Sequence, residues 1–61
     1  MMAFSVRYRV NRRGFVGSTS QLIDAKNRES AARKLKKKVS KAYRIQEDEI
    51  EILSIGIVGY Y

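Results

Sequence analysis

Lysine and arginine are the residues with which this chain can do chemistry, and most of them lie close together. Residues 28 to 44 hold eight of the thirteen cationic side chains, and after Glu29 they hold no acidic one. Ammonium and guanidinium groups bind phosphates and other anions through charge and hydrogen bonds. Solvated helices usually place acids and bases four residues apart, so an all-basic segment predicts a polyanionic ligand that supplies the missing negative charge. The alternative is an ordinary solvated helix face.

We expect two groups of phosphate-binding residues. The first is a ridge on one helix, made of Arg33, Lys34, Lys36, Lys37, Lys38 and Lys41. The second comes from a strand, a turn and the end of that helix, and consists of Arg7, Arg9, Arg12, Arg13 and Arg44. Arginine forks onto phosphate or stacks on bases, so the second group would add another contact area. Its alternative role is to protect a sheet edge from pairing with other chains.

Catalytic chemistry has few candidate residues here. The sequence has no histidine and no cysteine, which removes the commonest general base, the commonest metal ligand and the most reactive nucleophile. An acidic cluster, Glu47, Asp48, Glu49 and Glu51, has neither a histidine partner nor the glycine-bearing loop of a calcium site. We therefore predict no enzymatic activity, no metal and no cofactor. We expect these acids to balance the basic part of the chain or to contact a neighbouring subunit.

The 61 residues carry a net charge of +7 that is unevenly distributed. Residues 1 to 46 contain all thirteen cations and two acids, whereas residues 47 to 61 contain four acids and no cation. Such a field raises association rates with phosphate-bearing partners. The longest nearly uninterrupted apolar run, residues 55 to 61, is far shorter than the roughly 20 residues of a membrane-spanning helix, and no signal peptide is evident. We expect a cytoplasmic protein with no membrane partner.

Two strands and a turn are predicted in the first 25 residues. Apolar side chains at Phe4, Val6, Tyr8 and Val10 alternate with polar ones, which is the pattern of a strand with one buried face. The sequence from Asn11 to Gly14 favours a turn, because asparagine and glycine tolerate positive φ. Residues 15 to 25 predict a weaker, irregular edge strand, since glycine and hydroxyl residues dilute its apolar pattern.

A helix is predicted from a capping Asn27 to about Tyr43. The Asn27 side chain can accept a hydrogen bond from the backbone of Glu29 or Ser30, and Glu29 places negative charge at the helix start. Steps of three and four residues then give an apolar stripe of Ala31, Ala32, Leu35, Val39, Ala42 and Tyr43. This stripe would pack on the sheet and leave the lysine ridge on the opposite side.

The last predicted strand, residues 49 to 58, has an apolar pattern that changes phase. Ile50 and Ile52 share one face, whereas Leu53, Ile55 and Ile57 share the other. Either a bulge shifts the register or both faces of the strand are covered. We favour coverage on both faces, which places Leu53, Ile55 and Ile57 in an interface.

These elements predict one small α+β domain over residues 1 to 61 with the order β-β-α-β. A hairpin followed by a right-handed crossover gives a three-stranded antiparallel sheet in the order 2-1-3, with one helix packed on one face. The opposite face of the sheet stays open. We therefore expect a homodimer, or docking on another protein, through this face.

Residues 23 to 57 resemble the helix and last strand of the archaeal large-subunit ribosomal protein LX family. The resemblance is carried by Ala25-Lys26-Asn27, Glu29, Ala31, Arg44-Ile45, Ile50, Ile52 and Ile55. That family is small, basic and RNA-bound, so the resemblance implies ribosomal RNA as a partner. A small basic orphan protein from a virus or a mobile element is equally compatible with this sequence.

The leading hypothesis is a small accessory nucleic-acid-binding protein that contacts phosphates through its lysine-rich helix without base-specific chemistry. The resemblance favours RNA slightly over DNA. The alternative is a protein-protein interaction module or small regulator, for example a virus-encoded one. Such a module would dock on an acidic surface of a larger protein through the same lysines, or through Leu53, Ile55 and Ile57.

Overall fold

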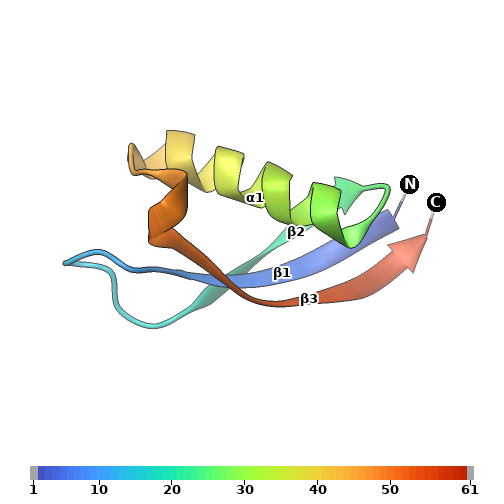
Figure 1. Cartoon of the computed structure of the whole chain (residues 1–61). Helices are drawn as coiled ribbons and strands as arrows, with labels where there is room; N and C mark the ends of the chain where they lie inside the picture. Colours follow the sequence, from blue (N-terminus) through green and yellow to red (C-terminus); the bar gives the residue numbers. More distant parts are fainter. Residues whose placement is uncertain (1, 61) are drawn as a thin grey trace.

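A computed structural model describes residues 2 to 60, with Tyr60 described by its backbone alone. In chain order the elements are β1 (Met2–Val10), β2 (Thr19–Ala25), the helix α1 (Arg28–Tyr43), the short 3-10 helix η1 (Glu47–Glu49) and β3 (Ile50–Tyr60). The strands form one antiparallel sheet in the order β2-β1-β3, and α1 packs against one face of it (Figure 1). The predicted α+β fold and strand order are confirmed.

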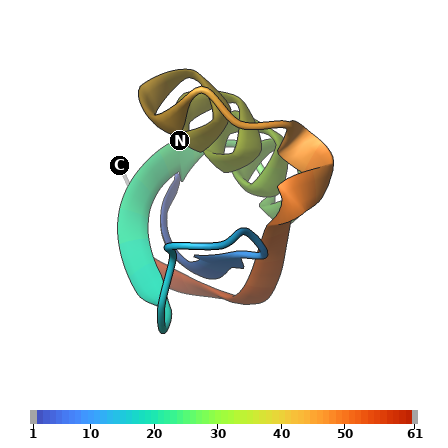
Figure 2. The same ribbon diagram turned by 90° about the vertical axis from the view of Figure 1, so that its left-hand side faces the viewer.

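The core lies between β1 and α1. Phe4, Val6 and Tyr8 point toward the helix and are almost completely buried, as the alternating pattern predicts. The tyrosine hydroxyl is satisfied inside this core, because the Gln21 side-chain amide donates a hydrogen bond of 3.1 Å to it. Ala31, Leu35, Val39, Ile23, Ala25, Ile45 and Ile50 complete the cluster. Figure 2 shows the sheet curving around one side of α1, which encloses this cluster.

Helix α1 begins and ends largely where the sequence predicts. The Asn27 side chain accepts a hydrogen bond of 2.8 Å from the backbone N–H of Ser30 and caps the first turn. The predicted apolar stripe is buried or partly buried from Ala31 to Val39, whereas Ala42 and Tyr43 of the last turn are exposed. Within residues 2 to 60, no helix has the length and apolar character of a membrane span.

Strand β3 does not have the register that we predicted. Ile55 lies opposite Val6 and Ile57 lies opposite Phe4, so both isoleucines belong to the face that packs on α1. The pairing with β1 shifts twice, once at Leu53 and once at Val58, each of which is an extra residue on β3. The change of phase in the sequence is therefore a bulge, and our preference for coverage on both faces is wrong.

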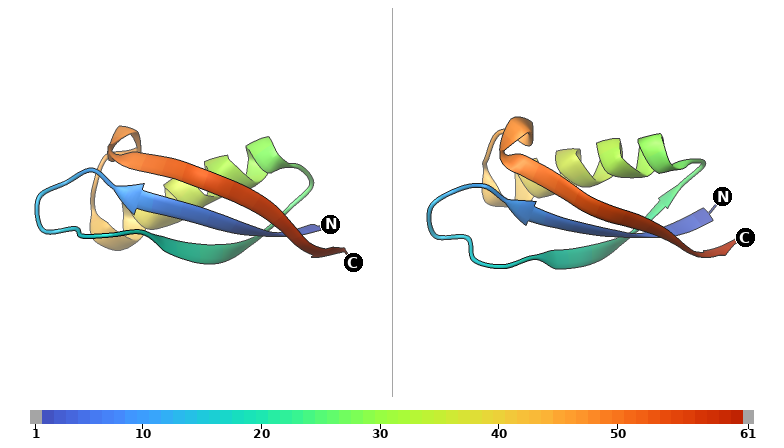
Figure 3. Two further views of the ribbon diagram at one scale, coloured as in Figure 1. Left: turned by 90° about the horizontal axis from the view of Figure 1, so that it is seen from below. Right: turned by 60° about the horizontal axis from the view of Figure 1, so that its bottom comes forward.

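Strand β2 is shorter than predicted. It begins at Thr19, and residues 11 to 18 form an exposed connection (Figure 3). This connection contains the predicted turn, which is closed by a hydrogen bond of 3.1 Å from the Phe15 N–H to the Arg12 carbonyl. Gly14 and Gly17 adopt φ values of 97° and 78° in this connection, a conformation that residues with a side chain rarely adopt. The prediction that β2 lies at a sheet edge is confirmed.

Candidate nucleic-acid interface

The exposed side of α1 carries a dense group of cations. Seven of its sixteen residues are basic and Glu29 is its one acid. Because Ala31, Leu35 and Val39 are buried against the sheet, the rotation of the helix about its axis is fixed. That rotation exposes Arg33, Lys34, Lys37, Lys38 and Lys41, a set that we call the lysine face. Lys36, which was also predicted to bind phosphate, is partly buried on the other flank of the helix.

The N-terminal half of the lysine face contains a shallow hollow. Ser30, Arg33, Lys34 and Lys37 line this hollow, which has a volume of about 170 Å³. The Lys34 ammonium also donates a hydrogen bond of 2.8 Å to the backbone carbonyl of Asp24, so this flank of the helix lies over the end of β2. Three cations and a hydroxyl around one small hollow can surround a phosphate or a carboxylate.

The lysine face forms no ion pair with an acidic side chain of the described residues. Among residues 2 to 60 there are two ion pairs, Arg9 with Glu51 at 3.0 Å and Arg12 with Glu49 at 3.6 Å, and neither involves a residue of the lysine face. In the part of the chain that the structure describes, no acidic group pairs with Arg33, Lys37, Lys38 or Lys41. Uncompensated like charges on one helix repel one another and attract a polyanion.

The second predicted group of cations does not join the lysine face. Arg7 and Arg9 alternate with the buried residues of β1 and therefore point to the sheet face opposite α1. Arg13 is exposed in the connection between β1 and β2, and Arg44 is exposed just after α1. The predicted phosphate-binding residues thus lie partly on α1, partly on the opposite face of the sheet and partly in the connections between elements. They do not form one surface.

Two of the predicted arginines are already paired with acids. Arg9 and Asn11 donate to the same Glu51 carboxylate oxygen, at 3.1 Å each, from the Arg9 Nε and the Asn11 Nδ2. The hydrogen bond from Asn11, then the hydrogen bond and the charge of Arg9, lower the pKa of Glu51. The expectation that acids after residue 46 balance the basic part of the chain is confirmed for Glu49 and Glu51. Arg9 and Arg12 are correspondingly less available to an external anion.

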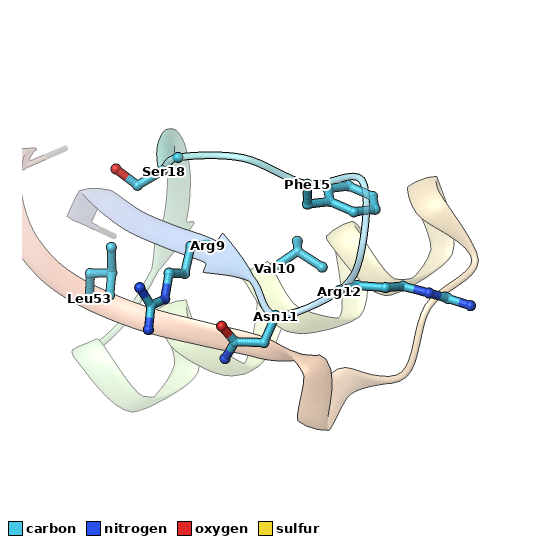
Figure 4. Close-up of a pocket in the computed structure, with 8 residues that line it drawn as sticks. Arg9, Val10, Asn11, Arg12, Phe15, Ser18 and Leu53 are labelled. Carbon is cyan, nitrogen blue, oxygen red and sulfur yellow. The ribbon is translucent and has the colours of Figure 1, made fainter.

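A second hollow lies where β1 leads into the connection to β2. It has a volume of about 470 Å³, and its walls include Arg9, Asn11, Arg12, Phe15, Ser18 and Leu53. Figure 4 shows the Phe15 ring on the loop side of this hollow and Arg9 and Leu53 on the strand side. The Phe15 ring also meets the Tyr43 ring edge-on, with centroids 5.3 Å apart. Sequence reasoning missed this hollow, because it depends on how the connection folds back toward the end of α1.

The three residues predicted to form an apolar interface do not lie together on the open sheet face. Ile55 is partly buried against the core, and Ile57 lies on the helix side of the sheet. The open face instead carries small residues opposite one another, Ala3 with Gly59 and Ser5 with Gly56. Leu53 is the one of the three predicted interface residues that lines the hollow beside Arg9.

Comparisons with protein-family models, with curated proteins and with solved structures find no match to this chain. The resemblance of residues 23 to 57 to ribosomal protein LX therefore stays an expectation from the sequence.

Proposed function

We propose that this protein binds nucleic acid without catalysis, through phosphate contacts made by the lysine face. The observation that carries the proposal is that four of the five cations of this face have no acidic partner among the described residues. The resemblance to ribosomal protein LX favours RNA over DNA as the ligand. Arg7, Arg13 and Arg44 would contribute secondary contacts at most, because they lie away from this face.

The length of the lysine face suits a strand of phosphates. Lys34 and Lys41 are seven residues apart, which corresponds to about 10 Å along the helix axis. A nucleic-acid strand that rises about 3.4 Å per nucleotide presents roughly three phosphates over that distance. Lysine ammonium groups on flexible stems follow such a row without fixed geometry.

The proposed binding is independent of base sequence. Lysine contacts to phosphate oxygens position a protein on nucleic acid but do not read its sequence. The lysine face carries no aromatic ring and no amide side chain, the groups that stack on bases or read their edges.

The proposal is tested by salt titration of binding. Fluorescence anisotropy with single-stranded RNA and with double-stranded DNA gives the affinity at several salt concentrations. For about four phosphate contacts, the logarithm of affinity should fall against the logarithm of salt with a slope near −3 for RNA and near −4 for duplex DNA. Polyglutamate serves as the control ligand for an acidic protein surface.

Each outcome of the titration supports or contradicts the proposed nucleic-acid binding. RNA binding that is stronger than polyglutamate binding, with the expected slope, supports the proposal. Absent binding at low salt, or a slope near zero, contradicts it. Polyglutamate binding as tight as RNA binding also contradicts it and favours docking on an acidic protein instead.

A further inference from the structure

The outer edge of β3 is long and uncharged. β3 has eleven residues, more than either other strand, and in the described part of the chain it pairs only with β1. After Glu51 no residue of β3 carries a charge, and the sequence contains no proline. Natural sheets usually protect such an edge with lysine, proline, a covering loop or β-bulges. Of these devices β3 has its two bulges, at Leu53 and Val58, and the edge between them is regular. Figure 1 shows β3 leaving η1 beside the helix and then running along the free side of the sheet.

The other edge of the sheet is protected. β2 has only seven residues, and the Lys34 ammonium is bonded to the backbone carbonyl of Asp24 on this strand. A lysine held against an edge strand discourages pairing with another chain. The two edges therefore differ, and only β3 offers a free edge of useful length.

Among the described side chains of β3, three apolar ones are exposed. Leu53 and Ile57 are each 42% exposed, and Val58 is 60% exposed. A second strand that pairs with β3 would therefore cover apolar surface.

We propose that β3 pairs antiparallel with β3 of a second copy of this chain, which joins two sheets into one of six strands. When two copies of the strand pair about Ile55, the uncharged residues that follow Glu51 in one copy lie along the same residues of the other copy. Glu51 then lies opposite Gly59, and it is already bonded to Arg9. No two like charges meet across this pairing.

The charge distribution also favours a second copy at this edge. The contact between Lys34 and Asp24 places one flank of the lysine face over β2, at the far edge of the sheet from β3. Pairing through β3 therefore keeps the two most basic surfaces apart, which limits the repulsion between two chains of charge +7. Because the β2 edge is protected, the association closes at two copies.

This dimer has a consequence for ligand binding that rests on the proposed function. An antiparallel pairing of identical edge strands has its two-fold axis perpendicular to the sheet, so both α1 helices lie on the same side. Two lysine faces would then contact one polyanion together, and the second contact would be intramolecular. The dimer is tested in the absence of nucleic acid. A negative result for the dimer therefore leaves the proposed nucleic-acid binding unaffected.

The test is the mass in solution, by light scattering at high salt, of the wild type and two matched variants. Val58→Lys adds one charge to β3, and Leu22→Lys adds the same charge at a 66% exposed position on β2. The wild type and Leu22→Lys should have twice the 7.0 kDa chain mass. Val58→Lys should be monomeric, with a self-association constant at least tenfold lower.

The proposal is overturned if the wild type is monomeric at hundreds of micromolar. It is also overturned if Val58→Lys and Leu22→Lys have the same mass in solution. A wild type that forms larger assemblies overturns it as well, because the β2 edge would then be in use. Amide hydrogen exchange of β3 gives a second measurement that needs no variant. Protection of its outward N–H groups should increase with protein concentration, and protection that does not change with concentration contradicts the pairing.

Discussion

The guanidinium of Arg9 lies 3.0 Å from the carboxylate of Glu51, across the pairing of β1 with β3. Both side chains are about half exposed, so the pair adds little to stability. Its effect is on the charge distribution. The pair neutralises one of the arginines on the open sheet face and leaves the lysine face as the main basic surface.

The first prediction concerns pH. Glu51 has a lowered pKa in the folded protein, so its contribution to stability is complete above the unfolded glutamate pKa of about 4.3 and is lost as the pH falls through the lower folded pKa. Thermal unfolding of the wild type and of Glu51→Gln between neutral and acidic pH measures this contribution. The wild type should be the more stable protein at neutral pH, and the difference should shrink in acid. A difference that grows in acid contradicts the assignment.

The second prediction concerns the end of α1. Arg44 has a φ of 56°, which is in the left-handed region, and its backbone N–H donates to the carbonyl of Ser40. Glycine adopts this conformation without strain, so Arg44→Gly should stabilise the protein by about 1 kcal/mol. For a domain of this size that raises Tm by roughly 4–8 °C.

Arg44→Ala is the control for the lost charge, because alanine keeps the backbone strain. It should leave Tm almost unchanged. Equal effects of the glycine and alanine variants would show that charge and not backbone conformation is responsible.

The third prediction concerns the contact between the connection and the helix. The Phe15 and Tyr43 rings meet at 89° with their centroids 5.3 Å apart. Edge-on aromatic pairs contribute about 0.5–1.5 kcal/mol beyond their buried area. A double-mutant cycle with Phe15→Leu and Tyr43→Leu, followed by urea unfolding, should give a coupling energy in that range. Strictly additive effects would mean that the rings do not stabilise each other in solution.

The sequence predicted those parts of the fold that depend on local pattern. The alternation from Phe4 to Val10 defines the buried face of β1, and Asn27 caps α1 because its side chain reaches the Ser30 N–H. Both features need only neighbouring residues. They fix the central strand and the helix, and the strand order follows from the crossover rule.

The register of β3 could not be derived in the same way. The phase change between Ile52 and Leu53 is visible in the sequence, but a bulge and a strand buried on both faces produce the same pattern. The choice between them is made by the pairing with β1, which is a long-range contact. The predicted placement of Leu53, Ile55 and Ile57 on the open sheet face was wrong for this reason.

The candidate site was predicted in composition but not in arrangement. The spacing of Lys34, Lys37 and Lys41 correctly placed them on the exposed side of α1. The ion pairs of Arg9 and Arg12 connect residues about 40 positions apart, so no local pattern reveals them. Because of these pairs, Arg9 and Arg12 have acidic partners, whereas the lysine face has none among the described residues.

The central claim is that polyanion binding depends on the lysine face and not on net charge alone. Two triple variants that remove equal charge test it most directly. One is Lys34→Gln with Lys37→Gln and Lys41→Gln, and the other is Arg7→Gln with Arg12→Gln and Arg13→Gln. Circular dichroism confirms that each variant is folded before anisotropy is measured with single-stranded RNA.

The lysine variant should lose at least tenfold in affinity at low salt, and its salt slope should become shallower by about 2, which corresponds to three lost phosphate contacts. The arginine variant should retain most of the wild-type affinity and slope. Equal losses in the two variants, or a larger loss in the arginine variant, would contradict the claim.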